Sequence, residues 1–166
     1  MSIIVFEHGD NDRIKRFGAV LNVHGHRLEV IRPDAGDPIP PDLDDVDGVV
    51  ACGGPASAND DADWIRAEAA FLRQAHEAAL PVVGICLGSQ ILAKSLGGEV
   101  APMERVELGW HEITLTATGR EDPVFTGIGW THNQFHWHRD MVTRLPDGAR
   151  LLASSAACKV QAWSLG

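Results

Sequence analysis

A cysteine between two glycines is the segment of this sequence best suited to covalent chemistry. The apolar run at residues 81–85 leads into Gly84-x-Cys86-x-Gly88, and helix-forming residues follow. A cysteine on a sharp strand-to-helix turn is exposed, and the helix N-terminus favours its thiolate form. The backbone N–H of Leu87 would then point at the oxyanion formed when Cys86 attacks a carbonyl group. The alternative is a small buried cysteine after an inner strand, with a packing role only.

A glycine pair could complete this site. Gly53-Gly54-Pro55 directly follows an apolar segment at residues 46–51. At the carboxyl edge of a parallel sheet, ligands bind and a loop of this kind can supply a second backbone N–H to an oxyanion. Glycine pairs also occur at strand ends simply to turn the chain. The interpretation of Gly53-Gly54-Pro55 as an oxyanion loop therefore depends on its lying beside the cysteine turn.

The elements that must position these residues alternate between strand and helix. Strands are expected over residues 2–6, 28–31, 46–51 and 81–85, and helices over residues 11–24, 61–79 and 89–96. This order predicts a parallel sheet with helices on its faces. Glu68 interrupts the apolar face of the second helix. Beyond Glu99, short strands without long helical patterns predict antiparallel additions to that sheet, at residues 104–116, 134–137, 151–154 and 160–163.

Composition excludes several classes of protein. The chain of 166 residues has a formal net charge of -9 and no basic stripe, which argues against binding nucleic acid. No apolar run approaches the ~20 residues that span a bilayer, so no membrane association is expected. The three cysteines cannot all pair within the chain. Reduced thiols and a cytoplasmic location follow as expectations.

Taken together, the motifs resemble those of the class I (triad-type) glutamine amidotransferases, in particular stand-alone proteins similar to the glutaminase domain of GMP synthase. The resemblance covers nearly the whole chain, and residues 84–90 match the nucleophile signature closely. Later landmarks follow in the family's order, at residues 108–110, 138–140, 145–149, 152–155 and 161–163. The resemblance implies an α/β, flavodoxin-like three-layer fold, with a mainly parallel central sheet and antiparallel strands in the C-terminal half.

The resemblance also implies a role for each matching residue. Cys86 would attack the side-chain amide of glutamine, releasing ammonia and leaving a γ-glutamyl thioester that water hydrolyses. Gly54 and Leu87 would donate N–H groups to the oxyanion, and Gln90 would hold the substrate. A loop would contact the α-amino and carboxylate groups of the substrate, through Trp137, His138, Arg139 and Asp140. Neither a cofactor nor a metal is implied. The expected substrate is glutamine or a related γ-glutamyl amide, and the expected partner is a separate, ammonia-accepting synthetase subunit.

The sequence departs from the family's pattern in two places. Arg139 stands where a glycine is usual, and glycine there allows close backbone approach to a ligand. The family's catalytic base lies in a His-Pro-Glu segment near the carboxyl end, and this sequence stops at Gly166 without one. Residues 1–166 are therefore expected to be a single, C-terminally truncated domain with impaired activity. His136 or His138 acting as an internal base is the alternative.

Two other interpretations remain open. A non-catalytic relative could bind glutamine or a partner protein without turnover. His132, His136 and His138 are separated by even numbers, so on one strand they would share a face with Asp140 and could form a metal site. A polar strand face or a substrate loop explains the same spacing without a metal.

Overall fold

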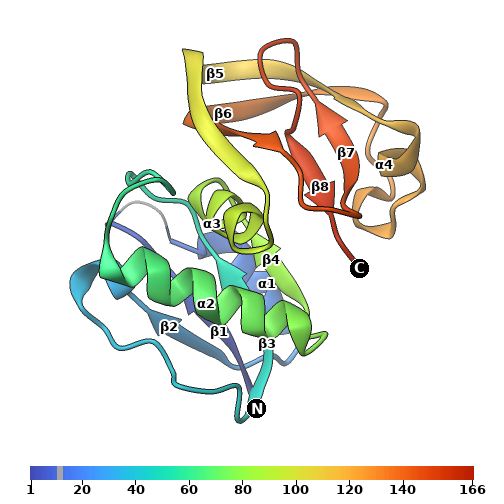
Figure 1. Ribbon diagram of the computed structural model, residues 1–166. Coiled ribbons are helices and arrows are strands. Elements are labelled where there is room, and N and C mark those ends of the chain that lie inside the picture. Colours follow the sequence, from blue (N-terminus) through green and yellow to red (C-terminus); the bar gives the residue numbers. More distant parts are fainter. Residues whose placement is uncertain (11–12) are drawn as a thin grey trace. The chain divides into compact units, whose positions relative to one another are not determined.

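The chain consists of two compact units, Met1–Leu96 and Gly97–Gly166. The structure is a computed structural model that describes residues 1–10 and 13–166 (Figure 1). Each unit contains its own four-stranded sheet. The expected start of the first helix, at residues 11 and 12, lies outside the described residues. Among the helices that are described, none has the length and apolar character needed to cross a bilayer.

The first unit is parallel α/β. Its elements in chain order are β1 (Ser2–Phe6), α1 (Lys15–Val23), β2 (Leu28–Ile31), η1 (Pro33–Ala35), β3 (Val46–Ala51), α2 (Asp63–Glu77), β4 (Val82–Gly84) and α3 (Leu87–Ser95). The strands are ordered β2-β1-β3-β4, and every neighbouring pair is parallel. The alternation of strand and helix in the sequence therefore predicted this half of the fold correctly.

Both faces of the parallel sheet are covered by helices. Ile3 and Val5 of β1 belong to a core cluster against which Leu21 of α1 packs. Side chains alternate along a strand, so Phe6 points to the opposite face. There its ring meets that of Phe71 on α2, edge to face, with centroids 5.5 Å apart. The first unit is thus a three-layer arrangement of helix, sheet and helix.

A buried ion pair joins the end of β1 to α2. His8 Nε2 lies 2.7 Å from Glu68 Oε2, and the two side chains are 1% and 0% exposed. His8 Nδ1 lies 3.1 Å from the carbonyl oxygen of Gly53, and Trp64 stacks on the ring. Both ring nitrogens face oxygen acceptors, so the doubly protonated ring satisfies both contacts. Burial works to lower the pKa of His8, but the hydrogen bond and charge of Glu68 raise it above its ordinary value.

The second unit is antiparallel. Its elements are β5 (Glu99–Leu115), α4 (Ala117–Glu121), η2 (Pro123–Phe125), β6 (Thr131–Arg144), β7 (Arg150–Ser154) and β8 (Ala162–Ser164), with strand order β6-β5-β7-β8. The antiparallel character of this half is confirmed. The expectation that these strands extend the parallel sheet is wrong, because they form a sheet of their own. The long β5–β6 ladder pairs the backbone groups of both strands with each other, and β7 takes the free edge of β5 near its end.

The register of β5 against β6 determines which side chains meet. Glu107 is opposite His138, and Gly109 is opposite His136. Directly opposed residues in an antiparallel pair lie on the same face of the sheet. The other face of the pair is exposed and aromatic, with Trp137 74% exposed. The strand pair therefore has one polar, buried face and one apolar, exposed face.

The buried pair of the first unit predicts a pH-dependent stability. Since the pKa of His8 is raised on folding, the pair contributes fully below the unfolded value of 6.5, and the contribution is lost as pH rises through the folded value. Glu68→Gln should lower the free energy of unfolding by about 3–5 kcal/mol at pH 6 and flatten its decline between pH 6 and 9. Urea unfolding across this range measures both effects.

The matched control is His26→Gln, which changes an exposed histidine of the same unit. It should keep both the stability and the pH dependence of the unchanged chain. If the unfolding free energy rises with pH, or if Glu68→Gln leaves its decline with pH unaltered, the pH dependence does not come from the His8–Glu68 pair.

Candidate functional site

Cys86 occupies the turn between β4 and α3. Its backbone has φ 52° and ψ -110°, a left-handed φ that L-residues other than glycine rarely adopt. Such a conformation costs about 1–3 kcal/mol and persists only where the surrounding structure imposes it. The side chain is exposed, and the carbonyl oxygen of Cys86 accepts a helical hydrogen bond from the N–H of Gln90 at 3.1 Å. The predicted strand, sharp turn and helix are all present.

Two glycines make this turn possible. A Cβ on Gly84 would lie 2.6 Å from the Cα of Ser89, and a Cβ on Gly88 would lie 2.1 Å from the carbonyl oxygen of Ala51. Both distances are too short for any side chain. The N–H of Gly88 donates to the carbonyl oxygen of Cys52 at 3.0 Å, so the first turn of α3 is bonded to the end of β3. The absence of side chains at Gly84 and Gly88 therefore allows the N-terminus of α3 to pack directly against the sheet.

The loop after β3 lies beside this turn, as the sequence predicted. β3 and β4 are hydrogen-bonded neighbours, with Ala51 opposite Gly84. A Cβ on Gly54 would lie 2.8 Å from the Cδ2 of Leu87 and 2.6 Å from the Cβ of His8. Gly54 and Leu87, the two residues predicted to stabilise an oxyanion, are therefore packed together. Their role as donors stays a prediction.

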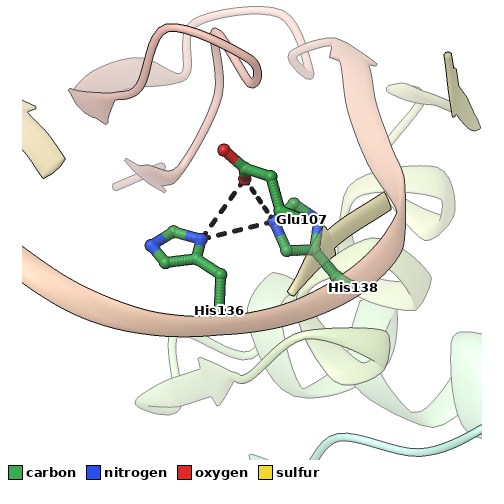
Figure 2. Close-up of side chains that lie close together, drawn as sticks. All are labelled: Glu107, His136 and His138. Atoms are coloured by element: carbon green, nitrogen blue, oxygen red, sulfur yellow. Dashed lines mark hydrogen bonds and ion pairs between the residues drawn. The ribbon is translucent and has the colours of Figure 1, made fainter. Parts of the chain in front are cut away.

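The second unit contains a buried polar cluster, Glu107, His136 and His138 (Figure 2). Glu107 Oε2 lies 2.7 Å from His138 Nε2 and 3.3 Å from His136 Nδ1. The two ring nitrogens are 3.4 Å apart. Ser155 donates to Glu107 Oε1 at 2.9 Å, and the amide nitrogen of Gln161 donates to Oε2 at 2.7 Å. The carboxylate, on β5, is therefore surrounded by groups from β6 and from the segment between β7 and β8.

The cluster favours a charged carboxylate beside a neutral imidazole. Burial works to raise the pKa of Glu107, but hydrogen bonds from Ser155, Gln161 and His138 hold it below its ordinary value. Burial lowers the pKa of His136, against the opposing charge of Glu107. The three donor atoms all lie within 4.8 Å of one another. An ionised carboxylate and neutral imidazole nitrogens are ligands for a divalent metal ion.

The residues expected to form a substrate loop lie in β6 instead. The predicted loop is part of a strand because residues 131–144 pair with β5 over most of their length. Trp137 and Arg139 are exposed on one face, whereas His138 and Asp140 point to the other. These four residues belong to the second unit, and Cys86, Leu87, Gly54 and Gln90 belong to the first.

The histidine spacing led to a partly correct grouping. His136 and His138 share a face, as the even spacing predicted, and their nitrogens meet. Glu107 completes the group in place of His132 and Asp140. Asp140 accepts a hydrogen bond from His138 Nδ1 at 3.0 Å through its backbone oxygen. Whether His136 or His138 serves as a base stays a prediction.

Sequence reasoning missed three residues of these sites. Glu107 is recognisable only once the register of β5 against β6 is known. His8 and Glu68 lie 60 positions apart in the sequence, and the pairing carries no local pattern. One signal was present: a charged residue on the apolar face of a helix requires a buried partner, and Glu68 has that position.

Comparison with known proteins identifies the family. Residues 14–164 match the family model for class-I glutamine amidotransferases. The chain is 37% identical over 142 residues, 82% of its length, to the putative glutamine amidotransferase-like protein YfeJ of Salmonella typhimurium. It is 32% identical over 98% of its length to the glutamine-hydrolyzing GMP synthase subunit of Natronomonas pharaonis, covering 79% of that protein. Gamma-glutamyl peptidase 3 of Arabidopsis thaliana is 30% identical over 95% of this chain and 68% of its own length.

Solved structures agree with this assignment. The crystal structure of a glutamine amidotransferase from Methylobacillus flagellatus matches 99% of this chain with a TM-score of 0.91 and 32% sequence identity. The chain spans 59% of the length of the Salmonella protein and 65% of the Methylobacillus chain. The family match covers far more than half of the sequence. The chain therefore belongs to the class-I glutamine amidotransferase family.

Proposed function

We propose that Cys86 hydrolyses the side-chain amide of glutamine, or of a related γ-glutamyl compound, through a thioester. The observation that supports this most directly is the strained, exposed backbone position of Cys86 at the N-terminus of α3. A left-handed cysteine held by two glycines that tolerate no side chain is typical of a nucleophile and unusual for a packing residue. Membership of the amidotransferase family supports the same chemistry.

The proposed reaction has two steps. The Cys86 thiolate attacks the amide carbon of the substrate, forming a C–S bond, and the C–N bond breaks as the nitrogen takes up a proton and leaves as ammonia. Water then attacks the γ-glutamyl thioester, which releases glutamate and restores the thiol. The N–H groups of Leu87 and Gly54 stabilise the oxyanion in both steps. Gln90, one helical turn beyond the cysteine, contacts the substrate.

His8 has a positioning role in this proposal. The carbonyl of Gly53 and the N–H of Gly54 belong to one planar peptide group and point in opposite directions. Holding the Gly53 oxygen at 3.1 Å from His8 Nδ1 therefore also fixes the direction of the Gly54 N–H. Glu68, on the other ring nitrogen, keeps His8 protonated and able to donate.

The choice of substrate and partner follows from the relatives. Similarity to the glutamine-hydrolyzing GMP synthase subunits favours glutamine as substrate, with ammonia passed to a synthetase subunit. Similarity to gamma-glutamyl peptidase 3 favours a γ-glutamyl peptide as the second candidate. That the segment of Trp137, His138, Arg139 and Asp140 contacts the α-amino and carboxylate groups, which both substrates share, stays a prediction.

Turnover by the 166-residue chain is expected to be slow. A cysteine nucleophile needs a neighbouring base to accept its proton, and general bases of this kind contribute about 10²–10⁴-fold. His136 and His138 are engaged with Glu107. Covalent labelling of Cys86 is therefore a more sensitive measurement than ammonia release, because it needs only one attack by the thiolate.

A glutamine analogue with a chloroketone in place of the amide should label the chain once, at Cys86, with glutamine protecting. Cys86→Ala should abolish labelling and any ammonia release, whereas Cys52→Ala, at a buried thiol, should retain both. Intact-mass and peptide mass spectrometry measure the labelling. Comparing glutamine with a γ-glutamyl dipeptide as protecting ligand distinguishes the two substrates. Labelling that persists in Cys86→Ala would exclude Cys86 as the nucleophile, and binding of glutamine without any labelling would favour a non-catalytic binding protein.

Gly54→Ala should slow the labelling by about 100-fold or more, the usual cost of losing one oxyanion donor. The added Cβ would collide with His8 and Leu87 and so displace the peptide that carries the donor. Gly129→Ala is the matched control, since a Cβ there meets nothing closer than 3.3 Å. Equal labelling rates for both variants would show that Gly54 takes no part.

A further inference from the structure

The side chains of Glu107, His136 and His138 bring three donor atoms together at a buried position, in an arrangement that suits a metal ion. We propose that these three side chains bind a divalent transition-metal ion such as Zn²⁺. The site lies entirely within the second unit, on the buried face of the β5–β6 pair. Metal binding there does not require the proposed chemistry at Cys86.

The spacing of the donor atoms fits a tetrahedral ion. Ligands about 2.0–2.1 Å from a tetrahedral zinc are roughly 3.3 Å from one another. His136 Nδ1 lies 3.3 Å from Glu107 Oε2 and 3.4 Å from His138 Nε2. The third separation, between Glu107 Oε2 and His138 Nε2, is 2.7 Å because a hydrogen bond joins these atoms. It lengthens when a metal replaces the shared proton.

The surroundings orient the ligands as metal sites do. The backbone oxygen of Asp140 accepts from His138 Nδ1 at 3.0 Å, which directs the Nε2 atom at Glu107. A metal ion bound at Nε2 would take the place of the proton that His138 donates to Glu107 and leave the Nδ1 hydrogen bond to Asp140 intact. Ser155 holds the second carboxylate oxygen at 2.9 Å. Hydrogen bonds of this kind to a ligating histidine and carboxylate are the usual outer support of a metal centre.

The three ligand side chains are largely buried. Exposure of the Glu107, His136 and His138 side chains is 3%, 7% and 14%. Gly109, opposite His136, has open space where a Cβ would lie. The amide nitrogen of Gln161 lies 2.7 Å from Glu107 Oε2 and 3.3 Å from His136 Nδ1. Rotating that amide presents its oxygen to the ion, so Gln161 can accommodate the metal without leaving the cluster.

A cavity of about 300 Å³ reaches the cluster, and Glu107, His111 and Ser155 contribute to its wall. His111 Nε2 is buried and has no hydrogen-bond partner among the described residues, and its ring lies 5.6 Å from that of His136. Two histidines and a glutamate leave a fourth position of a tetrahedral ion open, as in catalytic zinc sites. The cavity borders the proposed site at Glu107 and offers the ion a path to it.

Titration with Co²⁺ of the 166-residue chain, with its thiols reduced, tests the proposal. We expect one equivalent to bind and to give the absorption bands of tetrahedral Co²⁺ with nitrogen and oxygen ligands, without a thiolate charge-transfer band. Zn²⁺ should displace it. His136→Ala and Glu107→Gln should abolish binding, and Ser155→Ala should weaken it about 10–100-fold. Cys86→Ala and His26→Ala, at exposed residues outside the cluster, are the controls and should bind normally.

Three results would overturn the proposal. One is the absence of saturable binding by the unchanged chain, which would leave the cluster as a hydrogen-bonded network that holds β6. The second is a thiolate band that disappears in Cys86→Ala. The third is binding that survives His136→Ala. Circular dichroism checks that each variant is folded, and Ser155→Ala, which keeps all three ligands, decides the outcome if a ligand variant unfolds.

Discussion

The close contact between the first turn of α3 and the end of β3 is the constraint on which the proposed catalytic unit depends. The backbone N–H of Gly88 donates a hydrogen bond to the carbonyl oxygen of Cys52, and the approach is so close that no side chain fits at position 88. Because the helix begins there, the chain between β4 and α3 has only two residues in which to reverse. Cys86 takes up the strain as a left-handed residue and is exposed as a result. The exposure of the thiol is therefore a consequence of backbone packing.

The same constraint links the turn to the buried ion pair. Gly54 fills the narrow space between Leu87, the first residue of α3, and His8, at the end of β1. A buried ion pair loses much of its Coulombic gain to desolvation, so the His8–Glu68 pair is weak evidence for stability. Its geometric effect is more definite. The pair connects α2, the end of β1 and the Gly53 carbonyl, and so holds three segments in one arrangement.

The sequence predicted the first unit well because its signals are local. Glycine spacing around Cys86, apolar runs and helical periodicity each act over a few residues, and the alternation of strands with helices predicts a parallel sheet. The second unit was predicted less well. β6 was predicted too short because the polar residues 138–140 were assigned to a substrate loop, and β5 begins at Glu99, before the predicted residues 104–116. Pairing of Glu107 with His138 and of His8 with Glu68 depends on register and packing, which no single segment encodes.

The alternation of side chains along β5 and β6 couples two surfaces of the second unit. Glu107 and His138 meet on one face, while Trp110 and Phe135 meet on the other with ring centroids 5.9 Å apart. A slip of one residue between the strands would exchange the faces, exposing the charged cluster and burying the aromatic side chains. An insertion of two residues within either strand preserves the faces beyond it, whereas an insertion of one residue at the same place reverses them. Tolerance of this strand pair to insertions should therefore depend on whether their length is even or odd.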